Sequence, residues 1–458
     1  MSYRKAIILL PLIFVLSLHA TAQLKPGYSF QQDDKTLKDN YAKQSARKKA
    51  IYIANAQKEY AADYKKIYEE HFKEIASLWQ SDRSVTSSAE HQYLQSILQK
   101  ITSVNSELKN TDARIIFSRD WWPNAYSMGD GTIAINAGLL IFLNNEAELV
   151  FVLCHELAHY YLQHTTNAIK KYVETTNSET FQKELKRISK TEFGVNRQIE
   201  QLSKSFAFTS RRHSRENEAA ADKFAFQFMR KTGYDCKAIK SCLELLDKVD
   251  DSLIYKPFDL SQVFHFADYP FKKKWIQKES SIFGQLDESK EAGPQHEEDS
   301  LKTHPDCVKR IALLNDSLQT STAGQPFLVN ENVFNKLKKD FYYEMMEQCY
   351  RGNKLSRNLY YSLLLLQSGE NNQLAAHSVA RCLNTLYENQ KAHKLGSMVD
   401  SENKNYREEY NALLRMLDQL RLDEIASLNY RLCQRYASEM NGHKAFEEEM
   451  RKAQNFIK

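Results

Sequence analysis

The feature that most constrains this sequence is a histidine pair that directly follows a run of apolar residues. Leu149–Cys154 is apolar throughout, and the motif HELAH occupies positions 155–159 immediately after it. The apolar content and the start signal at Asn144 and Asn145 predict a helix, in which two histidines four residues apart lie on one face. Such a pair can bind one zinc ion, and Glu156 between them can act as a general base toward water at the open position of the metal.

A simpler interpretation of the motif is a surface helix that carries two solvated histidines. The apolar residues that precede His155 argue against it, because a helix of this composition is buried on most faces. Buried polar groups are costly unless they have a partner, and a metal ion is the natural partner for this set.

A third ligand is needed, and its position separates the classes of zinc peptidase. The extended metzincin motif requires glycine at 162 and histidine at 165, where this chain has Leu162 and Thr165, so that class is excluded. Downstream, Glu218 and Asp222 lie four residues apart in a second predicted helix. Glu218 would complete a His-His-Glu site, and Asp222 could accept the outer ring N–H of a ligating histidine. The alternative is a charged helix start whose acids suit the helix dipole.

Four segments resemble, in order, the gluzincin metallopeptidases that include the CAAX prenyl protease, HtpX and the periplasmic BepA-type proteases. The resemblance covers roughly residues 90–315, and its segments are Asn124–Leu140, Asn145–Leu149 leading through HELAH to His164, Ser214–Ala225, and Thr303-His304-Pro305 with Arg310-Ile311. It implies one zinc ion per chain with the ligands His155, His159 and Glu218, Glu156 as general base and Asp222 behind the ligands. His304 could be a fourth ligand or could polarise the scissile carbonyl, and a plain turn histidine before Pro305 is an equal alternative.

A short strand precedes the histidine motif. Residues 132–136 alternate apolar and polar side chains after a Gly-Asp-Gly turn, and residues 113–118 are typical of a partner strand. An edge strand beside the metal would bind an extended peptide through its main chain. Equally, the strand could only fill one face of the core.

The first 22 residues have the pattern of a secretory signal peptide. Basic Arg4 and Lys5 precede the apolar stretch Ala6–Leu18 and the small-residue motif Ala20-Thr21-Ala22, so cleavage is expected before Gln23. The apolar stretch is short for a membrane span, and no later segment qualifies. We therefore expect a soluble mature protein, secreted across the inner membrane into the periplasm, with an extracellular location as the alternative.

Charge and cysteine content add two constraints. The net charge of +5 falls to +3 without Arg4 and Lys5, so no strong attraction to nucleic acid is expected. Seven cysteines are present. An oxidising compartment would permit disulfides among them, although Cys154 within the histidine helix is most simply a buried small residue.

The rest of the chain is mostly helical, which gives an α+β fold dominated by helices. We expect a signal peptide at 1–22, an N-terminal helical segment at 23–88, a zincin-type metallopeptidase domain with a small β-sheet at 89–320, and a C-terminal helical module at 326–458. Within the second segment, residues 35–80 predict a long amphipathic helix or a helix pair. The C-terminal helices resemble tetratricopeptide hairpins, although a generic bundle fits equally well because no clean 34-residue repeat is found.

These features predict a zinc metalloendopeptidase that hydrolyses proteins of the cell envelope. Protein and peptide substrates are expected, with protein partners at the C-terminal module and no nucleic acid. Quality control of misfolded or unassembled proteins is implied by the resemblance alone. The alternative is a chaperone-like or scaffold protein whose zinc site is latent or structural.

Overall fold

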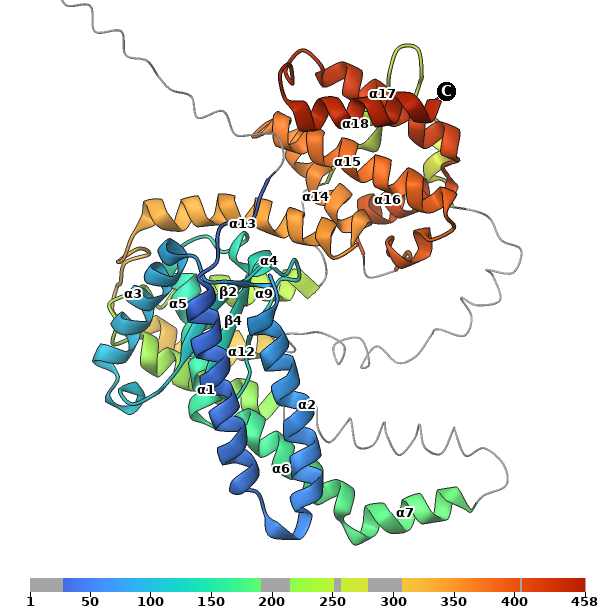
Figure 1. The fold of residues 1–458 in the computed structure, drawn as a ribbon. Helices are drawn as coiled ribbons and strands as arrows, with labels where there is room; N and C mark the ends of the chain where they lie inside the picture. The colour runs from blue at the N-terminus through green and yellow to red at the C-terminus, as the bar shows by residue number, and fades with distance from the viewer. Residues whose placement is uncertain (1–27, 191–214, 251–256, 279–306, 404–405, 458) are drawn as a thin grey trace, which may run out of the picture.

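The computed structural model describes residues 28–190, 215–250, 257–278, 307–403 and 406–457. The predicted signal peptide and His304 lie outside these residues. Helices dominate the described part and surround one small sheet, so the predicted α+β class with mostly helical content is confirmed (Figure 1). No helix among the described residues combines the length and the apolar content that crossing a membrane requires.

The sheet has four strands in the order β1-β2-β4-β3, formed by Ser84–Val85, Arg114–Ser118, Thr132–Asn136 and Ala125–Ser127. β2 and β4 pair in parallel along their whole length, from Arg114 opposite Thr132 to Ser118 opposite Asn136. The other two pairs are antiparallel. The predicted pairing of the two main strands is therefore correct. Residues 132–136 were expected to form either an edge strand that binds peptide or a strand that fills the core. They form the core strand, because β4 is buried and lies between β2 and β3. The edge strand beside it is β3.

Alternation along the strands divides the sheet into two faces. Ile116 and Ala134 point into a small core that is shared with α2 (Ala61–Gln80) and α6 (His164–Asn177). Their neighbours Ile115 and Ile133 point into the main core of the molecule, which also contains most of α5 (Glu146–Tyr161). The sheet therefore has helices on both faces, and the histidine helix lies on the side of the larger core.

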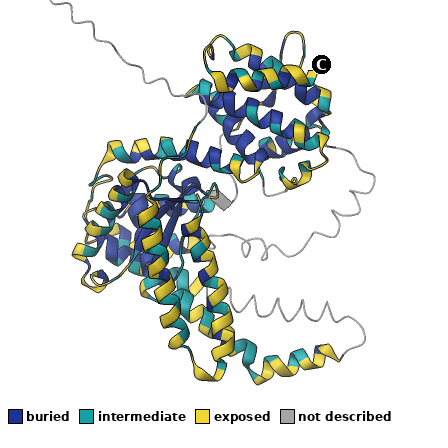
Figure 2. Ribbon diagram, in the orientation of Figure 1, coloured by how far each residue is buried: buried dark blue, intermediate teal, exposed yellow. Residues whose placement is uncertain are grey.

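The N-terminal helices form an antiparallel pair that extends from the sheet. α1 (Lys35–Ala54) packs along α2, α6 lies against α2, and α7 (Glu179–Ser189) turns to the side at the far end of the extension (Figure 1). The apolar side chains of α2 recur at helical spacing and face the sheet, at positions 64, 68, 72, 75, 78 and 79. Exposed residues predominate toward the far end of this extension (Figure 2). Of the two predicted forms, residues 35–80 thus adopt the helix pair.

Further helices complete the part of the chain that contains the sheet. They are α3 (Ser88–Val104), α4 (Ala137–Leu140), α5 (Glu146–Tyr161), a helix at 215–229, α9 (Ala238–Asp250), α10 (Leu260–Phe264) and α12 (Cys307–Gln319). Short 3₁₀ turns lie at Lys58–Tyr60, Ser106–Leu108, Lys273–Ile276 and Leu395–Ser397.

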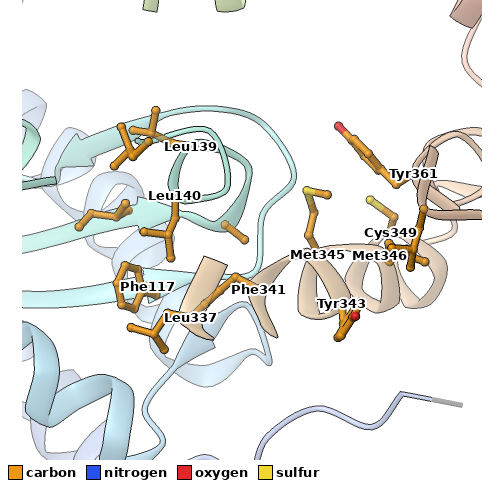
Figure 3. Packing of buried hydrophobic residues seen from close by; sticks show 14 of the residues in the cluster. Phe117, Leu139, Leu140, Leu337, Phe341, Tyr343, Met345, Met346, Cys349 and Tyr361 are labelled. Carbon is orange, nitrogen blue, oxygen red and sulfur yellow. The ribbon is translucent and has the colours of Figure 1, made fainter. Parts of the chain in front are cut away.

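The C-terminal helices pack on one another and, through the first of them, on the sheet. They are α13 (Glu331–Arg351), α14 (Leu355–Ser368), α15 (Asn372–Lys391), α16 (Glu408–Gln419), α17 (Leu422–Tyr436) and α18 (Lys444–Ile457). In α13, Phe341 meets Phe117 of β2 with ring centroids 4.8 Å apart, and Leu337 lies beside them (Figure 3). One continuous core therefore joins the two parts of the chain.

All seven cysteines lie in the described part of the chain as buried thiols. Burial raises the pKa of Cys154 above its usual range. The prediction that Cys154 is a buried small residue is confirmed, and no disulfide joins any of the seven.

Candidate metal centre

The histidine motif lies on α5, whose start is held in place by an asparagine cap and a buried carboxylate. The side chain of Asn145 accepts a hydrogen bond from Glu148 N (3.0 Å), which caps the helix as the sequence predicts. Glu146 is buried and accepts hydrogen bonds from the hydroxyls of Tyr93 (2.8 Å) and Tyr234 (2.7 Å). It also accepts from the backbone N–H groups of residues 328–330, just before α13. Hydrogen bonds to buried groups of other segments therefore fix the position of the first turn of α5.

Three predicted ligands converge at the other end of α5. The Nε2 atoms of His155 and His159 lie 3.0 Å apart. Glu218, from the helix at 215–229, places Oε2 3.3 Å from His155 Nε2 and Oε1 3.4 Å from His159 Nε2. In a tetrahedral zinc site with bonds of about 2.0–2.1 Å, neighbouring ligand atoms are about 3.3 Å apart. The two nitrogens and one carboxylate thus fit zinc in both spacing and donor type.

A buried ion pair supports these ligands from behind. Asp222 lies one turn after Glu218, and its Oδ1 is 3.0 Å from His155 Nδ1. Arg310 of α12 donates to both oxygens of Asp222 at 2.7 Å and lies 3.2 Å from Glu218 Oε2. Asp222 is 2% exposed and Arg310 4%. Arg310 was noted in the sequence only as part of a matching segment, and its contact with Asp222 and Glu218 was missed.

Glu156 lies on the same helix and is buried beside the edge strand. The backbone N–H of Ser127 in β3 donates a hydrogen bond to its carboxylate. Burial raises the pKa of Glu156, while the neighbouring histidines act in the opposite direction. A raised pKa brings a carboxylate closer to neutral pH, where a general base is most effective.

The site concentrates negative charge. Burial disfavours a charged imidazole at His155, but hydrogen bonds to Asp222 and Glu218 outweigh it and raise the pKa of His155 to about 10. Burial likewise opposes ionisation of Glu218, yet its two histidine neighbours and Arg310 hold its pKa well below the usual range. The described residues alone therefore favour an added cation at this point.

Another histidine contacts the site from the turn after α5. His164 Nδ1 lies 2.8 Å from His159 Nδ1. Burial, followed by the nearby His159, lowers the pKa of His164 to about 4. The sequence placed His164 at the end of the zinc helix, whereas it begins α6, and the sequence contained no signal for its ring contact. Glu156, Asp222 and the three proposed ligands are thus brought together, and His304 lies outside the described residues.

Comparisons with known proteins agree with this geometry. A weak match relates the chain to a protein of Vibrio cholerae serotype O1 (strain ATCC 39315 / El Tor Inaba N16961) that is named as a beta-barrel assembly-enhancing protease. The two are 24% identical over 152 residues, which is 32% of this chain and 31% of that protein. The chain thus matches about a third of the relative's length. The model of Peptidase family M48 matches residues 88–317, half of the chain, and includes every described residue of the site. The chain belongs to Peptidase family M48.

Proposed function

We propose that this protein is a zinc-dependent metalloendopeptidase with His155, His159 and Glu218 as the metal ligands. The observation that carries the proposal is that donor atoms of these three side chains lie 3.0–3.4 Å from one another. The buried Glu156 directly follows the ligand His155 in the same helix. Membership of family M48 supports a metalloprotease role. Bound zinc would supply Lewis acidity, which lowers the pKa of water to about 7 and polarises a carbonyl.

Glu156 moves the protons in this proposal. Its carboxylate takes a proton from the attacking water and later transfers it to the nitrogen of the leaving amine. The hydrogen bond from Ser127 N–H holds the carboxylate toward β3. Burial raises the pKa of Glu156, which makes its carboxylate a stronger base toward the attacking water.

The edge strand β3 is the proposed binding place for substrate. Among the described residues β3 pairs only with β4, so its other edge can accept an extended peptide by main-chain hydrogen bonds. Its residue Ser127 contacts Glu156, which would place the peptide beside the catalytic carboxylate. Main-chain recognition imposes little side-chain preference, which suits unfolded proteins as substrates.

The cell envelope is the proposed site of action. The signal-peptide pattern at residues 1–22 and the name of the Vibrio relative support secretion across the inner membrane to the periplasm and a role in envelope protein quality control. The C-terminal helices α13–α18 are proposed to bind protein partners. They share a core with the sheet, so a bound partner would be held in a fixed position relative to the metal site.

Cleavage of casein by the purified mature chain tests the proposal. Wild type, Glu156→Gln and a chelator-treated sample are compared, with bound zinc measured in each. We expect Glu156→Gln to keep its zinc and to cleave about 10²- to 10⁴-fold more slowly. Glu179→Gln, at an 86% exposed position on α7, is the matched control and should cleave as wild type does. A wild type that holds zinc and cleaves nothing would favour the chaperone-like alternative.

A further inference from the structure

The chain reverses sharply between α5 and α6, and one residue makes the reversal. Gln163 has φ 56° and ψ 35°, the left-handed conformation that non-glycine residues adopt at a cost of about 1 kcal/mol. This turn returns His164 to the metal site. Its ring meets that of His159 edge to face, with centroids 4.8 Å apart. The exposed Gln163 therefore adopts a strained backbone conformation, and this conformation allows the rings of His159 and His164 to meet.

The position of one proton follows from the geometry. His159 directs Nε2 toward His155 and Glu218, so this nitrogen must be unprotonated to bind a metal. A neutral imidazole then carries its proton on Nδ1. His159 Nδ1 lies 2.8 Å from His164 Nδ1, which must be the acceptor.

We propose that His164 is a positioning residue that accepts the Nδ1–H of His159 and thereby fixes the tautomer and ring orientation of this metal ligand. The inference rests on the proposed metal site and deepens it. It also makes the two histidine ligands unequal. His155 has the carboxylate of Asp222 behind it, whereas His159 has a neutral imidazole.

Charge balance explains why the second acceptor is neutral. The site holds three carboxylates, those of the buried Glu156 and Asp222 and the partly buried Glu218, and one buried guanidinium, Arg310. A divalent cation brings the sum to zero. A fourth carboxylate in place of the partly buried His164 would leave the site with an excess negative charge, which the protein interior solvates less well than water. An imidazole supplies the acceptor without that charge.

The test compares His164→Leu, which removes the acceptor, with His164→Asn, whose amide oxygen can accept the same N–H. The dissociation constant for zinc is measured by competition with a chromophoric chelator, and the visible spectrum of the cobalt-substituted protein reports the ligand field. We expect His164→Leu to bind zinc about 10- to 100-fold more weakly with a changed cobalt spectrum. His164→Asn should recover most of both. Lys170→Leu, on the exposed side of α6, is the control and should match wild type.

Two results would overturn the inference: a leucine variant that binds zinc within twofold of wild type with an unchanged cobalt spectrum, or an asparagine variant no better than leucine. If the leucine variant does not fold, His164→Ala takes its place, because it also lacks an acceptor. A wild-type protein that binds no zinc would overturn the proposed function as well. A wild type that binds zinc and cleaves casein, with His164 variants indistinguishable from it, would overturn the role of His164 alone.

Discussion

Arg310 donates two hydrogen bonds of 2.7 Å to Asp222, from Nε to Oδ2 and from Nη2 to Oδ1. The pair joins α12 to the helix at 215–229, and neither residue is a proposed metal ligand. Burial opposes the charge on each, but the pairing lowers the pKa of Asp222 and raises that of Arg310. Arg310 also lies 3.2 Å from Glu218. This one guanidinium therefore orients both the proposed ligand Glu218 and Asp222, the carboxylate that contacts the proposed ligand His155.

Removing Arg310 should therefore destabilise the metal-free protein. Arg310→Leu removes the guanidinium from the buried Asp222 and leaves it, among the described residues, only the contact with His155, and breaking a buried ion pair in this way costs about 3–5 kcal/mol. The double variant with Asp222→Leu should lose much less than the sum of the two single variants. Urea unfolding in the presence of chelator measures these values. Leu313→Ala, at a 71% exposed position of α12, should change the unfolding free energy by less than about 0.5 kcal/mol. Additive effects of the two changes would show that the ion pair is not coupled.

Local sequence patterns predicted the parts of the site that lie within single elements. The apolar run before His155 and the start signal at Asn144 and Asn145 predict the helix, and the spacing of Glu218 and Asp222 predicts that both lie on one face of a second helix. Residues 132–136 form a strand because their apolar and polar residues alternate. Each of these features depends on neighbours within about one or two helical turns, which periodicity detects.

Features that depend on distant contacts could not be predicted in this way. Ala125–Ser127 is too short for its alternation to be recognised, so the edge strand was not identified. Arg310 is 88 residues from Asp222 in the chain, and no local pattern connects them. The contact of His164 with His159 needs a left-handed residue at position 163, where glutamine gives no signal for one.

A buried ion pair lies at the junction between the sheet and α13, beside the apolar core that they share. Arg119 Nε donates to Glu344, and both residues are almost fully buried. Glu344 also accepts from the Tyr28 hydroxyl (2.7 Å) and from Gln31 N (2.9 Å), which attaches the N-terminal segment. The guanidinium groups of Arg119 and Arg351 lie 4.3 Å and 4.0 Å from the centre of the Phe30 ring.

Glu344→Gln should loosen this junction, because it leaves the buried charge of Arg119 with one carboxylate fewer. We expect a loss of about 3–5 kcal/mol in unfolding free energy and faster proteolysis within residues 28–34. Unfolding in urea and limited proteolysis measure the two effects. Asp340→Asn changes a more exposed ion pair on the same helix and should cost at most about 1 kcal/mol. Equal effects of the two substitutions would contradict the role of Glu344.

Gly138 in α4 should not tolerate alanine. Helix propensity alone predicts a gain of about 1 kcal/mol for this change, but a Cβ atom at this position would lie 1.8 Å from the carbonyl oxygen of Trp121. The backbone must move, so we expect a loss of about 1–3 kcal/mol. Gly396→Ala has no atom within 4 Å of its Cβ and should be neutral. Thermal unfolding of both variants decides the sign, and a stabilised Gly138→Ala would disprove this packing.

Stability should fall in mild acid because of His377. Burial, and after it the positive charge of Arg381, lowers the pKa of His377 to about 4. Lys452 acts in the same direction, whereas the carboxylates of Glu449 and Glu347 act in the opposite one. The unfolded chain, with a histidine pKa of about 6.5, binds the proton more tightly. The difference between the two pKa values makes the free energy of unfolding depend on pH. This contribution to the stability is fully present above pH 6.5 and is lost as the pH falls toward 4, and the loss reaches about 2 kcal/mol by pH 5. His377→Leu should lack this part of the pH dependence, which urea unfolding at pH 7.5 and pH 5 measures. Identical pH profiles for the two proteins would contradict a buried neutral imidazole.

Zinc should stabilise the folded chain through the three proposed ligands. A metal that binds only the folded state adds about 2.7 kcal/mol at a free concentration of 100 times its dissociation constant. Wild type should therefore unfold at a higher temperature with zinc than with chelator, and the shift should grow with the logarithm of free zinc. The unfolded chain exposes thirteen histidines and seven cysteines, which can also bind zinc and reduce the shift, so free zinc is buffered at low concentration. His155→Ala removes one ligand and should lose most of the shift, because two remaining donors hold zinc far more weakly than three. An equal shift in this variant would place the stabilising zinc elsewhere in the molecule.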